Sequence, residues 1–147
     1  MQIYIDADAC PVVALTISIA KEYNIPVVLI CDTSHVLEKY DAQIITVEKG
    51  ADSADLKLAN KVSKEDIVVT QDYGLAALCL GKGTVALNQN GLIYTNDNID
   101  SLLFSRYANK KQRMQGKRIK GPKKRSEQNN IDFKNALISI LEQKKNA

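Results

Sequence analysis

A run without any polar side chain, Pro26-Val27-Val28-Leu29-Ile30-Cys31, limits the folds open to this chain. Aliphatic and β-branched residues in an unbroken row are typical of a strand that is buried on both faces of a parallel sheet. A sheet of this kind needs helices over both of its faces. The run therefore predicts an α/β fold with a mainly parallel sheet.

Strands and helices alternate along the rest of the chain. Further strands are expected at 3–5, 43–47, 67–70 and 84–87, and helices at 11–23, 51–62, 73–80, after Thr95 and after Ser126. With 147 residues, the chain is long enough for one domain with its own core. We predict a single three-layer domain over residues 1–147. The expected core stripes of the last two helices are Ile99, Leu102, Leu103 and Tyr107, and Phe133, Leu137, Ile140 and Leu141.

The cysteines and the apolar runs indicate the compartment. Cys10, Cys31 and Cys79 are scattered and form no C-x-x-C pair, so neither a disulfide framework nor a zinc knuckle is indicated. The chain does not begin like a secretory signal peptide. Its longest apolar run, 12–20, is too short to span a bilayer. We expect a cytoplasmic protein without a membrane partner.

Charge is divided unevenly along the chain. The net charge of +3 conceals a body, residues 1–105, with 7 basic and 14 acidic residues. Residues 106–125, which we call the basic segment, have 10 basic residues and no acidic one, and residues 126–147 have 3 of each. An acidic cluster that binds a cation, beside a segment that holds an anionic polymer, suits chemistry on nucleic acid.

Aspartates stand where the expected strands end. Asp6 and Asp8 come directly after the first strand and Asp72 after a later one, while Asp52 and Asp55 stand at the start of a helix. The carboxyl ends of parallel strands meet at one edge of the sheet, which is where ligands bind in open α/β folds. We therefore expect these five side chains to converge there.

Carboxylates brought this close to one another favour a bound cation. Two of them about 5 Å apart, at an effective dielectric of about 20, repel by roughly 3 kcal/mol, on the order of two pKa units. Mg²⁺ or Mn²⁺ removes this repulsion and prefers oxygen ligands. His35 is the only histidine, which leaves little room for a histidine-based site. We therefore expect a divalent cation among these aspartates.

Some of these aspartates also have a purely structural interpretation. Asp52 and Asp55 stand where a helix cap or a first-turn carboxylate is expected, and Asp8 could cap the helix that follows Pro11. Asp6 is harder to explain in this way, because a carboxylate that ends a buried strand is costly unless it is paired or bound.

The basic segment is the candidate for contacting nucleic acid. Its second half, 116–125, contains two glycines and Pro122 and is expected to form a loop. Tyr107 is its only aromatic residue, so we expect contacts with phosphate rather than base stacking. The alternative is a solvated segment that only keeps the protein soluble. The predicted nucleic-acid-binding residues are Arg106, Lys110, Lys111, Arg113, Lys117, Arg118, Lys120, Lys123, Lys124 and Arg125.

Several blocks of the sequence resemble the YaiI/YqxD family of uncharacterised bacterial proteins. They are 5–12 (I-D-A-D-A-C-P-V), 50–55 (G-A-D-S-A-D), 66–72 (D-I-V-V-T-Q-D) with Leu75-Ala76, and Gly121-Pro122 ahead of Phe133. The resemblance covers nearly the whole chain. That family is grouped with PIN-like domains, metal-dependent ribonucleases with three or four acidic residues at the carboxyl ends of a parallel sheet. The resemblance implies a PIN-like fold and a nuclease-like site. Its implied metal ligands are Asp6, Asp8, Asp52 and Asp72, and its implied catalytic residues are these four and Asp55.

The leading hypothesis is a Mg²⁺- or Mn²⁺-dependent ribonuclease. Leu56 departs from the family pattern, because many members have an acidic residue there. A haloacid-dehalogenase-type phosphatase is one alternative, since an apolar strand followed by D-x-D also begins that superfamily, with Thr70 in place of its second motif. A non-catalytic RNA- or ribosome-binding protein is the other. Nothing in the sequence indicates the oligomeric state.

Overall fold

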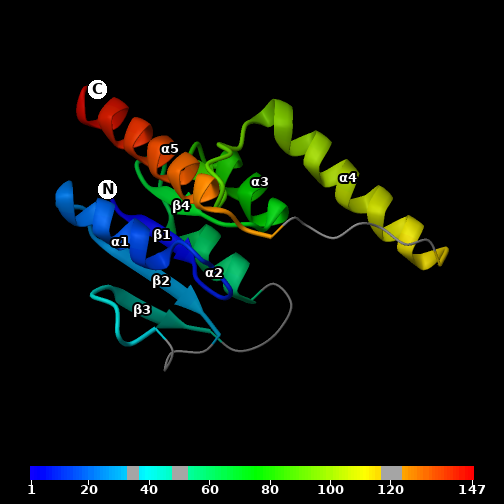
Figure 1. The fold of residues 1–147 in the computed structure, drawn as a ribbon, viewed down its shortest axis with the longest axis horizontal. Helices are drawn as coiled ribbons and strands as arrows, with labels where there is room; N and C mark the ends of the chain where they lie inside the picture. Colours follow the sequence, from blue (N-terminus) through cyan, green and yellow to red (C-terminus); the bar gives the residue numbers. More distant parts are fainter. Residues whose placement is uncertain (33–36, 48–52, 117–123) are drawn as a thin grey trace.

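The computed structural model describes residues 1–32, 37–47, 53–116 and 124–147. In these ranges five strands form one parallel sheet in the order β3-β2-β1-β4-β5 (Figure 1). β1 spans Ile3–Asp6, β2 Val27–Cys31, β3 Gln43–Thr46, β4 Ile67–Val69 and β5 Val85–Leu87. Ile5 of β1 pairs with Leu29 on one side and with Val69 on the other. The strand that ends in Asp6 is therefore the centre of the sheet.

Side chains alternate across the sheet and divide the core into two halves. On β1, Ile3 and Ile5 face one half and Tyr4 faces the other. All residues of β2 are buried, as the unbroken apolar run predicts. The sheet thus has two apolar faces, and each has to be covered by helices.

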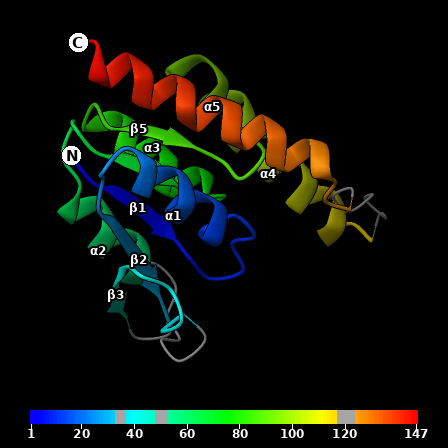
Figure 2. The same ribbon diagram turned by 60° about the vertical axis from the view of Figure 1, so that its left-hand side comes forward.

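Helices cover both faces (Figures 1 and 2). On one face lie α1 (Val13–Glu22) and α5 (Glu127–Lys145), and on the other lie α2 (Ser53–Lys61), α3 (Tyr73–Gly81) and the first turns of α4 (Asn96–Met114). The predicted three-layer α/β fold with a parallel sheet is therefore confirmed. The predicted core residues of α5 are confirmed as well, since Phe133, Leu137, Ile140 and Leu141 are all buried.

The first helix begins later than expected. We predicted a start at Pro11, but α1 begins at Val13, and its N-cap, Val12, makes no side-chain capping bond. A tight turn precedes it, in which the Cys10 N–H donates to the Ala7 carbonyl oxygen at 3.2 Å and Ala9 has a φ of 57°. A left-handed conformation is uncommon for alanine and marks a turn under local strain, directly after Asp8.

The expected core stripe of α4 is only partly correct. Ile99 is buried and Leu102 and Leu103 are half-buried, but Tyr107 is 63% exposed, so the prediction for Tyr107 is wrong. The later turns of α4 extend away from the sheet (Figure 1). Its start is as predicted: the Thr95 hydroxyl accepts from the Asn98 N–H at 3.1 Å. α4 and α5 have 19 residues each, and no helix in the described ranges is apolar enough to cross a membrane.

The two phenylalanines provide a matched test of this packing. Phe133 lies on the buried face of α5 and is 0% exposed, whereas Phe104 on α4 is 70% exposed. Phe133→Ala should lower the free energy of unfolding by about 3–5 kcal/mol, because it leaves a cavity in the core. Phe104→Ala should change it by no more than about 0.5 kcal/mol. Urea denaturation of both variants measures this, and equal losses would contradict the described position of α5.

Candidate functional site

Thr70 joins the ends of β1 and β4. It directly follows β4 and is buried. Its Oγ1 donates to Asp6 Oδ2 at 3.0 Å and accepts from the Asp72 N–H, also at 3.0 Å. One hydroxyl group therefore brings Asp6 and Asp72 together at the carboxyl edge of the sheet, as the sequence predicted for these two aspartates.

Tyr94 supports Thr70 from the core. The Tyr94 hydroxyl donates to the Thr70 carbonyl oxygen at 3.0 Å, and burial raises the pKa of this phenol. The ring of Tyr73 packs edge-on against Tyr94, with centroids 6.1 Å apart. Sequence reasoning missed Tyr73 and Tyr94 and treated Thr70 only as a possible phosphatase motif. The available signal was a hydroxyl residue between an apolar strand and Asp72.

The electrostatic environment of Asp6 disfavours its ionised form. Burial is the main cause that raises the pKa of this carboxyl group, and the nearby carboxylates of Asp72 and Asp8 raise it further. The hydrogen bond from Thr70 lowers it in part. The carboxyl groups of Asp6, Asp8 and Asp72 create a negative potential at this edge of the sheet, and a bound cation would neutralise it.

Asp8 and Asp72 each make a local structural contact. Asp8 Oδ2 accepts from the Asp32 N–H at 2.8 Å, which ties the turn after β1 to the end of β2. The N-cap position of α1 is held by Val12, and not by Asp8, for which the sequence left that structural role open. Asp72 is the N-cap of α3, because its Oδ1 accepts from the Leu75 N–H at 3.1 Å. Among the described residues, only Oδ1 of Asp72 accepts a hydrogen bond, so its Oδ2 could face a further ligand.

A cavity of about 480 Å³ links Asp72 to the start of α2. Asp55 lies in the first turn of α2 and lines this cavity together with Asp72 and Arg106. Gly74 leaves the space beside Asp72 open, since a Cβ there would lie 3.2 Å from Asp72 Oδ1. Leu56 lines the same cavity and is 55% exposed.

The donors fit a hard divalent cation by type. Carboxylate oxygens with an open space beside Asp72 are what Mg²⁺ and Mn²⁺ bind. Within the described residues, however, no three histidine, cysteine, aspartate or glutamate side chains form a group that could hold a metal ion. Asp52, the fourth predicted ligand, lies outside the described residues. The predicted ligands therefore match a metal site in their chemistry, without a preformed cluster.

Basic side chains of α4 begin at this cavity. A second cavity, of about 370 Å³, is lined by Tyr73, Ser105, Arg106, Asn109, Lys110 and Arg113. Arg106 lines both cavities, so the basic face of α4 begins beside Asp55 and Asp72. Lys111 lies on another side of the helix, in a hollow with Phe104 and Tyr107. Lys117, Arg118, Lys120 and Lys123 lie outside the described residues.

The last two predicted nucleic-acid-binding residues differ from each other. Lys124 is exposed. Arg125 is bound within the fold: its Nη1 donates to Asn90 Oδ1 at 2.7 Å, and its Nη2 donates to the Gln89 carbonyl oxygen at 2.9 Å and to Asn130 Oδ1 at 2.6 Å. These bonds hold the turn after β5 against the start of α5. Arg125 thus has a structural role that the sequence did not suggest.

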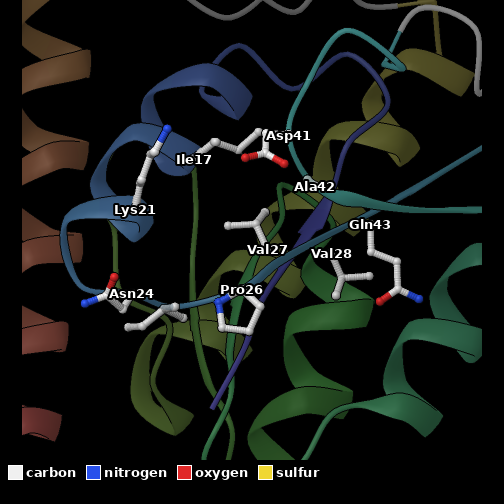
Figure 3. Close-up of a pocket in the computed structure, with 10 residues that line it drawn as sticks. Ile17, Lys21, Asn24, Pro26, Val27, Val28, Asp41, Ala42 and Gln43 are labelled. Carbon is white, nitrogen blue, oxygen red and sulfur yellow. The ribbon is translucent and has the colours of Figure 1, made fainter.

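Another cavity lies at the opposite edge of the sheet. It has a volume of about 540 Å³ and is lined by residues such as Lys21, Asn24, Pro26 and Gln43 (Figure 3). These residues lie near the amino ends of β2 and β3. A strand of five residues rises about 16 Å, so this cavity is separated from the aspartates by the length of the sheet. We do not assign it to the site.

The raised pKa of Asp6 predicts a pH-dependent stability. Because the folded-state pKa lies above the ordinary value of 3.8, the folded protein binds the proton more tightly than the unfolded chain. The contribution of Asp6 to stability is therefore present below about pH 4 and lost as pH rises through the folded-state pKa. Asp6→Asn, which keeps an oxygen acceptor for Thr70, should become more stable than the wild type across that window, in the absence of divalent cations.

Urea denaturation at several pH values measures this difference. Asp100→Asn, which removes an exposed carboxyl group from α4, is the control for the change in net charge. A stability difference between Asp6→Asn and wild type that stays flat or falls with rising pH would contradict the proposed environment of Asp6.

Comparison with known proteins assigns the chain to a family. Residues 4–143 match the family model described as "Uncharacterized BCR, YaiI/YqxD family". A UPF0178 protein of Ruminiclostridium cellulolyticum is 52% identical over 96% of this chain and 92% of that protein, and one of Natranaerobius thermophilus is 43% identical over the full length of both. No solved structure matches the chain. The chain belongs to the YaiI/YqxD family, as its sequence blocks predicted.

Proposed function

We propose that the protein is a divalent-metal-dependent ribonuclease that hydrolyses phosphodiester bonds of RNA. The observation that carries this proposal is that Arg106 lines two cavities. One is the cavity of Asp55 and Asp72, and the other is the cavity of about 370 Å³ along α4, which we call the basic groove. A polyanion held along α4 would have a phosphate next to the carboxylates. The substrate would then be bound and hydrolysed on one continuous surface, formed by the two cavities that share Arg106.

The aspartates have separate roles in this proposal. Asp6, Asp8, Asp52 and Asp72 would hold Mg²⁺ or Mn²⁺, with Thr70 fixing the orientation of Asp6. When bound, the ion supplies activation of a water molecule and stabilisation of the leaving oxygen. Asp55 lines the same cavity as Asp72 and would accept the proton of the attacking water.

The basic segment would bind the RNA backbone. Arg106, Lys110 and Arg113 line one groove, and phosphate contacts of this kind position a nucleic acid without reading its sequence. We place the activity in the cytoplasm, because the scattered cysteines indicate a reducing compartment.

The phosphatase alternative has less support. In that reading the hydroxyl of Thr70 would bind the substrate phosphate, but Thr70 is buried and its hydroxyl donates to Asp6. The non-catalytic RNA-binding alternative differs from a nuclease in one measurable property, which is the absence of cleavage when metal is present.

The test is cleavage of single-stranded RNA by the purified protein with Mn²⁺. Asp72→Asn should reduce the rate by about 100-fold or more, because it removes a ligand charge while asparagine still caps α3. Asp100→Asn, on the exposed side of α4, should cleave like the wild type. Gel analysis of an end-labelled RNA panel gives the rates. Binding of RNA without cleavage across that panel would instead support the non-catalytic alternative.

A further inference from the structure

The groove between α3 and α4 has the composition of a nucleotide subsite. Its basic residues, Arg106, Lys110 and Arg113, are spaced four and three residues apart and lie on one face of α4. Ser105 and Asn109 add two polar side chains, and no acidic residue of the described ranges lines the groove. Its volume of about 370 Å³ falls in the range of about 300–1,000 Å³ that is usual for small-ligand sites.

An aromatic ring also lines this groove. Tyr73 is the first residue of α3 and is half-buried. Its ring contacts Tyr94 at an interplanar angle of 68°, and Tyr94 is fixed in turn by its hydrogen bond to the Thr70 carbonyl oxygen. A ring held in this way loses little freedom when a ligand stacks on it, so the position is pre-organised.

The fold brings this ring to the basic segment from a distant part of the sequence. Within the segment itself Tyr107 is the only aromatic residue, and it lines a different hollow with Phe104 and Lys111. Tyr73 instead directly follows Asp72 and shares its groove with Arg106. A nucleotide in the groove would therefore be adjacent to the candidate catalytic carboxylates.

We propose that this groove is a subsite for single-stranded RNA, in which one unpaired base stacks on Tyr73 while Arg106, Lys110 and Arg113 hold the flanking phosphates. Cationic grooves with stacking rings are the mode by which proteins bind single strands. Paired bases are already stacked and do not offer a free face, so the subsite selects against duplex RNA. This inference rests on the proposed function in taking RNA as the ligand, and it concerns binding rather than cleavage.

The experiment measures fluorescence anisotropy of labelled single-stranded oligouridylate and oligoadenylate with the full-length protein, in EDTA to prevent metal-dependent cleavage. Tyr73→Leu should weaken binding by about 5- to 100-fold, while Tyr73→Phe, which keeps the ring, should bind like the wild type. The salt slope should be unchanged in Tyr73→Leu and shallower by about 0.7 in Arg106→Gln. Tyr107→Leu, an exposed aromatic outside the groove, is the matched control and should bind normally.

A second measurement uses the unmodified protein, in case Tyr73→Leu fails to fold. On irradiation, an RNA that contains 4-thiouridine should form a cross-link to Tyr73. Mass spectrometry identifies the cross-linked residue. Equal binding by wild type and Tyr73→Leu, equal losses in Tyr73→Leu and Tyr107→Leu, or cross-links confined to other residues would overturn the subsite. If an acidic peptide displaces the RNA, and if it does so equally well from wild type and Tyr73→Leu, the groove would be assigned to a protein partner instead.

The two proposals fail in distinguishable ways. Tyr73-dependent binding of single strands, without cleavage in Mn²⁺, would remove the ribonuclease and leave the subsite. Cleavage of RNA with an affinity that does not depend on Tyr73 would remove the subsite and leave the ribonuclease.

Discussion

The hydroxyl group of Thr70 is the contact on which the site depends. It donates to Asp6 at the end of the central strand and accepts from the backbone N–H of Asp72, the residue that caps α3. The Thr70 carbonyl oxygen is held by Tyr94, whose ring also contacts Tyr73. A single threonine therefore contacts the carboxylate of Asp6, the backbone at the start of α3 and, through Tyr94, one side of the groove along α4.

This arrangement places the carboxyl group of Asp6 where its ionised form does not stabilise the fold. Burial and two neighbouring carboxylates disfavour ionisation of Asp6, and a nearby alanine, Ala9, has a left-handed backbone conformation. Perturbed titration and local strain are concentrated at functional sites, where stability is given up for reactivity or binding. The basic face of α4 begins at the same edge, so the two opposite potentials meet at Arg106.

The sequence predicted those features that depend on local patterns. Unbroken apolar runs such as β2 indicated buried parallel strands, and Thr95 marked the start of α4 through its hydroxyl group. Asp6 and Asp72 were assigned to one edge because parallel strands end together. Features that depend on strand order were not predictable in this way: the contacts of Thr70 with Asp6 and with Tyr94 join residues 64 and 24 positions apart. Tyr107 was misplaced because helical spacing does not tell how far a helix follows the sheet.

We propose that the sheet edge between β1 and β4 binds a divalent cation through its carboxylates. The most direct measurement is anomalous X-ray diffraction from crystals of the protein grown with Mn²⁺. We predict an anomalous peak between the carboxyl groups of Asp6 and Asp72. Mn²⁺ peaks only at other places on the protein, with no density at this edge, would contradict the account.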